Sequence, residues 1–95
     1  MAVYADVGNL QFEDGASIIV RYRVDVKDPA GHALGRLTGR AMAFEDGAFG
    51  NRAGSPCVLH LKDGKCWDCL LASTTVNGAE LAPRGQRGLY ECAKG

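Results

Sequence analysis

The most regular pattern in the chain is an alternation of apolar and polar residues from Ser17 to Lys27. Every second residue is apolar, and four of the five residues on the other face (Ile19, Arg21, Arg23, Asp25 and Lys27) are charged. The apolar positions are Ile18, Val20, Tyr22, Val24 and Val26. Successive side chains of a β-strand point to opposite faces, so a period of two is typical of a strand that is buried on one face only. We therefore predict a strand over Ser17–Lys27.

The segment after this strand can fold back on it as a hairpin. A four-residue loop over residues 29–32 places large side chains opposite small ones on the apolar face, as interdigitated packing favours. The expected pairs on that face are Val26 with Gly35, Val24 with Leu37, Tyr22 with Gly39, and Val20 with Ala41. On the other face Asp25 meets Arg36, an ordinary cross-strand charge pair. Residues 38–45 are also the best helix candidate, in competition with this second strand.

Turn signals recur between the apolar runs. Dipeptides of the Asp-Gly or Asn-Gly type suit two-residue type I′ turns, because both central residues of such a turn need a positive φ. They are Asp14-Gly15, Asp46-Gly47, Asp63-Gly64 and Asn77-Gly78. We predict a second hairpin over residues 57–71, in which the third dipeptide forms a two-residue turn and places His60 opposite Trp67. The same register places Val58 opposite Cys69 and puts Cys66 on the same face as Cys57.

Shorter β-prone runs predict strands near residues 3–7 and 88–92, whereas the glycine-rich residues 45–55 indicate a loop. Residues 73–87 are ambiguous. Short antiparallel strands must hide their edges, either by closing into a barrel or by packing as two sheets. The sequence therefore predicts an all-β fold: a small antiparallel barrel or sandwich of five or six strands built from hairpins, in a single β-rich domain over residues 1–95.

Composition narrows the function classes. The chain has 95 residues, enough for one domain, and 13 of them are glycine, which favours turns over helices. Its 11 basic and 11 acidic residues cancel, so no net field attracts nucleic acid or an anionic membrane. The first 12 residues lack the Lys or Arg of a secretory signal, and no apolar run reaches about 20 residues. We therefore expect a cytoplasmic protein that binds no membrane. The sequence does not determine its oligomeric state.

The most distinctive motif has the spacing C-x2-H-x5-C-x2-C and consists of Cys57, His60, Cys66 and Cys69. Thiolate and imidazole groups are what a tetrahedral zinc site uses. On regular strands, however, residues three apart point to opposite faces, so one ion cannot collect all four side chains. We therefore expect no metal or cofactor and treat the cysteines as small buried hydrophobic residues, with a structural zinc site as the alternative. A disulfide between Cys92 and either Cys57 or Cys66 is a further alternative.

Four arginines share the polar face of the first predicted hairpin: Arg21, Arg23, Arg36 and Arg40. Arginine suits phosphate and carboxylate groups, and small barrels can bind nucleic-acid strands on an open sheet face. An anion or nucleic-acid site on this face is therefore an alternative function. Against it, no aromatic residues alternate with the arginines for base stacking, and a solvated charged face explains the same pattern.

Trp67 and His60 form the candidate surface for a protein partner, because the predicted register places them side by side and tryptophan is enriched at interface hot spots. The alternative for Trp67 is a place at the edge of the core. We find no catalytic constellation: the serines lie in no nucleophile motif, and no helix follows Cys66-x2-Cys69, as a catalytic dithiol needs. The sequence therefore predicts a non-catalytic binding or interaction module. Its expected partner is another protein, bound through an exposed edge strand or the region of Trp67.

Overall fold

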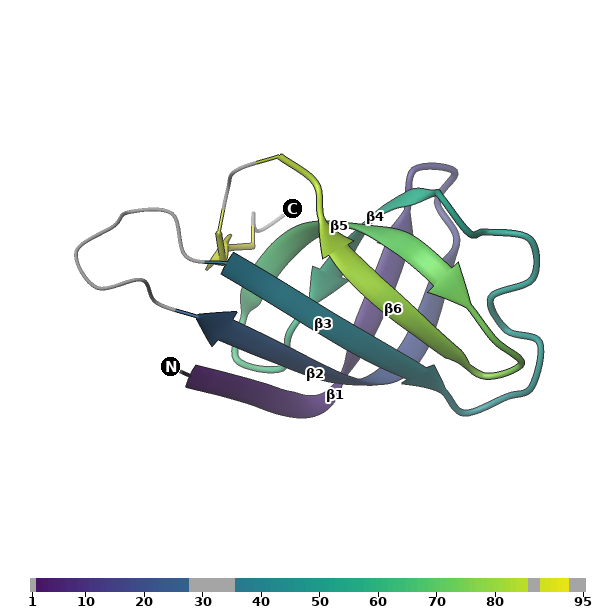
Figure 1. Cartoon of the computed structure of the whole chain (residues 1–95), viewed down its shortest axis with the longest axis horizontal. Coiled ribbons are helices and arrows are strands. Elements are labelled where there is room, and N and C mark those ends of the chain that lie inside the picture. Colours follow the sequence, from purple (N-terminus) through teal and green to yellow (C-terminus); the bar gives the residue numbers. More distant parts are fainter. Residues whose placement is uncertain (1, 28–35, 86–87, 93–95) are drawn as a thin grey trace.

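The computed structural model describes residues 2–27, 36–85 and 88–92, and the statements below concern these residues (Figure 1). They form seven β-strands and no helix, so the all-β class predicted from the sequence is confirmed. The strands are β1 (Ala2–Phe12), β2 (Ser17–Lys27), β3 (Arg36–Ala43), β4 (Pro56–His60), β5 (Lys65–Thr74), β6 (Gly78–Pro83) and β7 (Tyr90–Glu91). This part of the chain has no helix long and apolar enough to cross a membrane.

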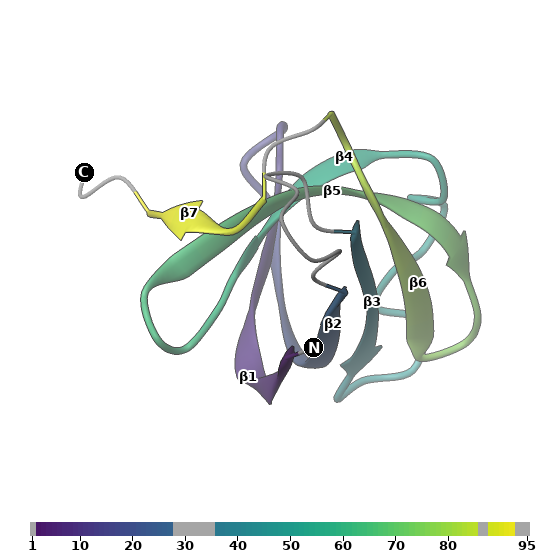
Figure 2. The same cartoon turned by 60° about the vertical axis from the view of Figure 1, so that its left-hand side comes forward.

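Six of the strands close into an antiparallel barrel in the order β4-β1-β2-β3-β6-β5, and β5 returns to pair with β4. The barrel consists of two three-stranded meanders, β1 to β3 and β4 to β6, which meet where β1 pairs with β4 and β3 pairs with β6. Figure 2 shows the strands curving around a common interior, with the short β7 beside β5. Of the two predicted architectures, the barrel is the one found.

The predicted strand over Ser17–Lys27 is confirmed as β2 with the same bounds. Its apolar face lies in the core, where Val20 and Val24 are fully buried and Tyr22 is 4% exposed. Between these positions, Arg21 and Arg23 are exposed on the outside of the barrel. The alternation in the sequence therefore corresponds to the inside and outside of the barrel wall.

Strand β3 pairs with β2, but two residues further along than predicted. The pairs include Val26 with Leu37, Val24 with Gly39, Tyr22 with Ala41, and Val20 with Ala43. Asp25 lies opposite Thr38, so the predicted pairing of Asp25 with Arg36 is wrong. Because strand side chains alternate with a period of two, a shift of two residues leaves every side chain on its predicted face. The predicted loop over residues 29–32 lies outside the described residues.

The side chain of Trp67, on β5, gives a physical reason for this register. Trp67 is fully buried, and a Cβ added at Gly39 would lie 2.8 Å from Cζ3 of the indole. The observed register therefore puts a residue without a side chain beneath the largest side chain of the core. This packing partner comes from the other half of the barrel, which reasoning from the hairpin alone does not include.

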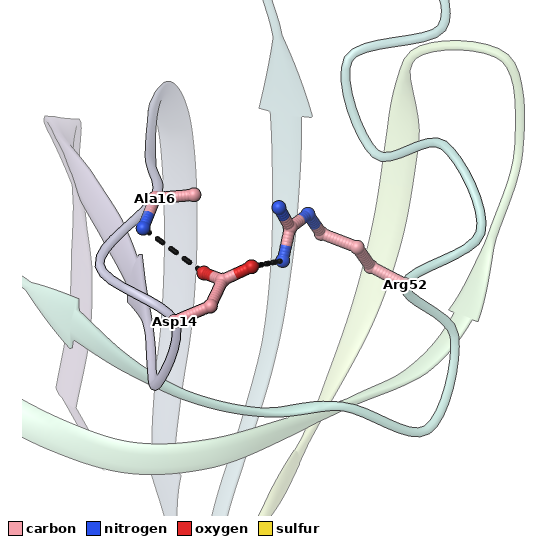
Figure 3. A network of polar contacts seen from close by, with 3 residues as sticks. All are labelled: Asp14, Ala16 and Arg52. Atoms are coloured by element: carbon pink, nitrogen blue, oxygen red, sulfur yellow. Dashed lines mark hydrogen bonds and ion pairs between the residues drawn. The ribbon is translucent and has the colours of Figure 1, made fainter.

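The β1–β2 hairpin closes through a three-residue loop instead of a two-residue type I′ turn. The N–H of Phe12 donates to the carbonyl oxygen of Ala16 at 2.8 Å, and Gly15 has a φ of 93°. Asp14 lacks the positive φ that a type I′ turn demands. Figure 3 shows the Asp14 carboxylate accepting the N–H of Ala16 at 3.0 Å and pairing with Nη1 of Arg52 at 3.3 Å. The bond from Ala16, and after it the charge of Arg52, hold the pKa of Asp14 below its usual value.

The β4–β5 hairpin repeats this loop. The N–H of Leu61 donates to the carbonyl oxygen of Lys65 at 2.8 Å, and Gly64 has a φ of 92°. The Asp63 carboxylate accepts the N–H of Lys65 at 3.1 Å, as Asp14 does in the first hairpin. The two-residue turn predicted here is therefore wrong, and the loop contains one residue more than predicted.

That extra loop residue shifts the register between β4 and β5 by one. The pairs are Leu59 with Trp67, Cys57 with Cys69, and His60 with Cys66, instead of His60 with Trp67 and Val58 with Cys69. A one-residue shift exchanges the two faces of a strand. Trp67 and Cys69 consequently face the interior, while Cys66 lies on the same side of the sheet as His60. The predicted placement of Cys66 with Cys57 is wrong for this reason.

The remaining segments agree with the predictions in part. Residues 45–55 connect β3 to β4 without a strand, and Phe49 in their middle is 1% exposed as part of the core. The strand predicted near residues 3–7 extends over all of β1, and residues 88–92 contain β7. The ambiguous residues 73–87 contain the end of β5 and all of β6. The helix alternative for residues 38–45 is wrong, because this segment continues β3 to Ala43.

Candidate functional site

The cysteine–histidine motif is divided by the wall of the barrel. Cys57 and Cys69 point into the core, where they are 1% and 0% exposed, whereas His60 and Cys66 lie together on the other side of the sheet. The four side chains therefore do not converge on a common point. The physical reason is the one stated from the sequence, although the division between the faces differs from the predicted one.

The inner pair is a buried cross-strand contact. The Sγ atoms of Cys57 and Cys69 lie 3.4 Å apart, and both cysteines are free thiols. The hydrogen bond between the two sulfurs, followed by burial, raises the pKa of the Cys69 thiol above its usual value. Both side chains are buried in the core, so the pair matches the predicted role of small buried hydrophobic residues.

On the outer side of the sheet, His60 and Cys66 are joined by a third residue, Cys92, from the C-terminal part of the chain. Cys66 forms a disulfide with Cys92, which is one of the two long-range bridges considered from the sequence. Strand β7 brings Cys92 there by pairing Tyr90 with Cys66, and the N–H of Cys92 donates to the carbonyl oxygen of Gly64 at 3.1 Å. The description of Cys66 as a free buried thiol is therefore wrong.

His60 lies against both sulfurs of this disulfide. Its Nδ1 is 3.3 Å from Sγ of Cys66 and 3.6 Å from Sγ of Cys92. On the other side of the ring, Nε2 is 2.8 Å from Oε1 of Gln11. An amide oxygen only accepts hydrogen bonds, so Nε2 carries the hydrogen and Nδ1 presents its lone pair to the sulfurs. The nitrogen and the two sulfurs all lie within 4.8 Å of one another.

Two further contacts hold β7 against the barrel beside this cluster. The hydroxyl of Tyr90 donates to Oδ1 of Asp68 at 2.5 Å, and Nζ of Lys65 lies 3.7 Å from Oε1 of Glu91. Both contacts join β7 to β5. They position Cys92 through neighbours that do not depend on the disulfide itself.

Sequence reasoning missed two members of the cluster, for different reasons. Cys92 was visible as the fourth cysteine and as a possible bridge, but its position beside His60 depends on the pairing of β7 with β5. Gln11 carries no sequence signal at all. Its contact with His60 arises because β1 pairs with β4, which places Asn9 opposite His60 and Gln11 two pairs further along, on the same face of β1 as Asn9.

The predicted arginine face is present on the outside of β2 and β3. Arg21, Arg23 and Arg40 are exposed, and Arg23 lies directly opposite Arg40. Both members of this like-charge pair have carboxylate neighbours: Nε of Arg23 is 3.4 Å from Asp25, and Nη2 of Arg40 is 4.0 Å from Glu80. Arg36 pairs with Lys27 at the end of the ladder, and the position of its side chain lies outside the described part.

Exposed apolar side chains lie among these arginines. Most of the large exposed hydrophobic residues belong to β1, β2 and the end of β3, or directly follow β3: Val3, Val7, Ile19, Met42 and Phe44, which are between 40% and 60% exposed. Val7 and Met42 both flank Arg21 in the strand register, and the two valines line the outside of β1. We call these residues with Arg21, Arg23 and Arg40 the basic–apolar face. The guanidinium of Arg21 lies 6.0 Å from the ring centre of Phe44, so an aromatic residue does border the arginines.

Strand β1 borders this face and has one unpaired side. Residues 2–8 pair with β2, and pairing with β4 begins only at Asn9; no other described strand pairs with residues 2–8. The N–H of Phe12 points toward β2, and N–H groups alternate in direction along a strand, so Val3, Ala5 and Val7 direct theirs away from β2. The N–H of Val7 donates to Oδ1 of Asp6 at 2.8 Å.

Trp67 does not lie on a surface. Its side chain is fully buried, deeper than the place at the edge of the core given as the alternative, and it offers no area to a partner. His60, predicted beside it, lies on the opposite side of the sheet within the sulfur cluster.

The comparison with known proteins adds no family to this description. No protein-family model, no curated protein and no solved structure matches this chain.

Proposed function

We propose that this protein is a non-catalytic interaction module that binds an extended segment of another protein along the free side of β1. The observation that supports the proposal is the unpaired side of residues 2–8 next to the basic–apolar face. An unpaired strand edge presents a row of N–H and C=O groups that a second strand can use.

The side chains around this edge indicate the composition of the partner. Main-chain hydrogen bonds supply affinity in strand addition, and alternate side chains supply specificity. Val3 and Val7 offer apolar contacts at every fourth residue of β1, and Arg21 and Arg23 lie opposite Val7 and Ala5 on the neighbouring strand. The expected partner segment therefore alternates apolar and acidic residues.

Asp6 limits pairing at this edge. Its carboxylate occupies the N–H of Val7 and lies 3.8 Å from Nζ of Lys62. A charged side chain on an edge strand is a common protection against unselective pairing. A partner strand therefore has to displace Asp6 from this N–H with one of its own backbone carbonyl oxygens.

The proposal is tested with phage-displayed random peptides selected on the purified protein. We expect enrichment of extended sequences with alternating apolar and acidic residues. Ala5→Pro removes an N–H that points away from β2, so it should abolish peptide binding with little change in thermal unfolding. Ala5→Val, which keeps the N–H, is the matched control and should bind like the original protein. Equal binding by Ala5→Pro, or no enriched sequences at all, would contradict the proposal.

The arginines also support a second candidate, the binding of single-stranded nucleic acid on the basic–apolar face. Phe44 next to Arg21 offers one aromatic ring to a base. A fluorescent oligonucleotide titrated at several salt concentrations tests this candidate. Affinity that falls steeply with salt and disappears in Arg21→Glu would favour it, and affinity independent of salt would remove it.

A further inference from the structure

We propose that His60, Cys66 and Cys92 bind a single Zn²⁺ ion when the disulfide between the two cysteines is reduced. The three residues come from the end of β4, the start of β5 and the residue after β7. This site differs from the zinc site considered from the sequence, since it excludes Cys57 and Cys69 and includes Cys92. It is independent of the edge of β1 and of the partner proposed to bind there.

The distances around His60 already fit a tetrahedral zinc ion. With Zn–S bonds of about 2.3 Å and a Zn–N bond of about 2.0 Å, a ligating nitrogen and sulfur lie about 3.5 Å apart, and two ligating sulfurs about 3.8 Å apart. Nδ1 of His60 lies 3.3 Å from one sulfur and 3.6 Å from the other. The two distances from Nδ1 to the sulfurs therefore already suit a tetrahedral ion. Only the two sulfurs, which are bonded to each other in the disulfide, have to move apart.

The orientation of His60 also suits a metal ligand. Gln11 accepts the hydrogen of Nε2, which leaves the lone pair of Nδ1 directed at the sulfurs. Histidine ligands in metal sites almost always donate their second ring N–H in this way, because the bond fixes both the tautomer and the orientation of the ring. Gln11 would therefore act as a positioning residue that does not touch the ion.

Reduction requires an external dithiol, and the burial of the two sulfurs determines how it acts. Cys66 is 2% exposed and Cys92 is half-buried, so a thiolate of the reductant attacks Sγ of Cys92. The bond between the cysteines breaks and Cys66 leaves as a thiolate, which takes up the proton released by the first thiol. The second thiol of the reductant then attacks the mixed disulfide and frees Cys92. The reductant ends as a disulfide, and the protein gains two electrons and two protons.

Zinc binding follows without further redox chemistry. The ion replaces the protons of the two thiols, so two protons are released, and neutral His60 supplies a lone pair. Three protein ligands leave the fourth position of the tetrahedron to a water molecule or to a ligand from outside the chain. Either the disulfide or the ion then connects β5 to the residue after β7. The redox state of the surroundings selects between the two connections.

Spectroscopic titration of the reduced protein with Co²⁺ under anaerobic conditions tests the site, since tetrahedral Co²⁺ bound to thiolates absorbs visible light strongly. We expect one Co²⁺ per chain, displaced by one Zn²⁺, with the same stoichiometry of zinc in native mass spectrometry. The oxidised protein should bind neither ion. Equal binding by oxidised and reduced protein would overturn the proposal.

Substitutions identify the ligands. Cys92→Ser and His60→Ala should each remove the visible absorption, whereas Cys69→Ala, which changes a cysteine of the inner pair, should keep it. Gln11→Ala should lower zinc affinity by about 10- to 100-fold without changing the spectrum, as the loss of an orienting partner does. A spectrum that survives both Cys92→Ser and His60→Ala, or that disappears in Cys69→Ala while the protein stays folded, would assign the ion to other residues.

Discussion

The contact between Gly39 and Trp67 determines how the interior of the barrel is filled. Trp67 projects from β5 across the interior toward β3 and is fully buried. At Gly39, any Cβ would lie 2.8 Å from the indole, closer than real Cβ contacts. Protein cores are packed at crystal-like density, so the ring cannot retreat without displacing further side chains. The pair therefore acts as one packing unit.

Gly39→Ala should lower the free energy of unfolding by about 1–3 kcal/mol, the usual cost of inserting a methyl group into a filled core. Urea denaturation followed by Trp67 fluorescence measures the change. Gly88→Ala is the matched control, because a Cβ at Gly88 meets nothing within 4 Å. If Gly39→Ala lowers the free energy of unfolding no more than Gly88→Ala does, the indole ring of Trp67 can move aside.

Tyr22 predicts a loss of stability at alkaline pH. Burial, the largest cause, raises the pKa of the Tyr22 hydroxyl above its usual value of 10.0, although the N–H of Lys62 donated to it opposes the shift. The unfolded chain therefore ionises this group at a lower pH than the native protein does. The stabilising contribution is complete below pH 10.0 and is lost as the pH rises from there through the raised native pKa.

The measurement is the urea midpoint of the original protein and of Tyr22→Phe between pH 8 and about 11. Both proteins lose stability as other groups ionise, but the original protein should lose more than the variant above about pH 10. If the urea midpoints of the two proteins fall in parallel with pH, ionisation of Tyr22 does not contribute to the loss of stability.

At the scale of the elements, the two hairpins β1–β2 and β4–β5 show how a loop determines a register. Each has three loop residues, an aspartate whose carboxylate accepts the N–H two residues later, and a glycine at positive φ. The dipeptide Asp-Gly fits both this loop and a type I′ turn. For β4–β5 the choice between them shifts the pairing by one residue, which decides whether Cys66 or Cys69 faces His60.

Gly64→Ala should therefore cost about 1–2 kcal/mol, because the loop needs the left-handed conformation that a Cβ disfavours. Gly64→Asn should cost less, since asparagine tolerates that conformation better than other residues with a side chain. Chemical denaturation of the two variants side by side tests the loop. If alanine and asparagine are equally tolerated, the positive φ of Gly64 does not constrain the hairpin.

At the scale of the whole molecule, the disulfide connects the C-terminal part of the chain to a barrel that is closed without it. The six barrel strands pair in a ring, whereas β7 pairs with β5 at only two positions, Lys65 and Cys66. The bond between Cys66 and Cys92 therefore adds a covalent connection between this two-residue strand and the barrel. Cytoplasmic localisation stays a prediction, and in a reducing compartment the proposed zinc ion would take over this connection.

Reduction of the disulfide should lower the free energy of unfolding by about 3.5 kcal/mol, because the two cysteines are 26 residues apart and the unfolded chain regains the freedom of that loop. Urea unfolding with and without a reductant measures the loss. The double variant Cys66→Ser with Cys92→Ser should be insensitive to the reductant. A stoichiometric amount of Zn²⁺ should restore part of the stability to the reduced protein and none to the double variant.

Much of the fold could be read from local patterns. The alternation over Ser17–Lys27 predicted β2 and both of its faces, and recurring turn signals predicted an antiparallel all-β fold. The candidate site could be read only in part. The position of Arg21 and Arg23 outside the barrel followed from the same alternation, whereas the partners of His60 did not, because they depend on pairings with β1, β5 and β7.

The sequence by itself determined which side chains of a strand share a face, because that depends only on a backbone period of two and on which face is buried. The tertiary structure decided which strand faces which and at what register. Those choices depend on contacts between distant segments, such as Trp67 over Gly39, and on loop conformations that one dipeptide leaves open. Gln11 and His60 are 49 positions apart in the chain, and only closure of the barrel through β1 and β4 brings them into contact.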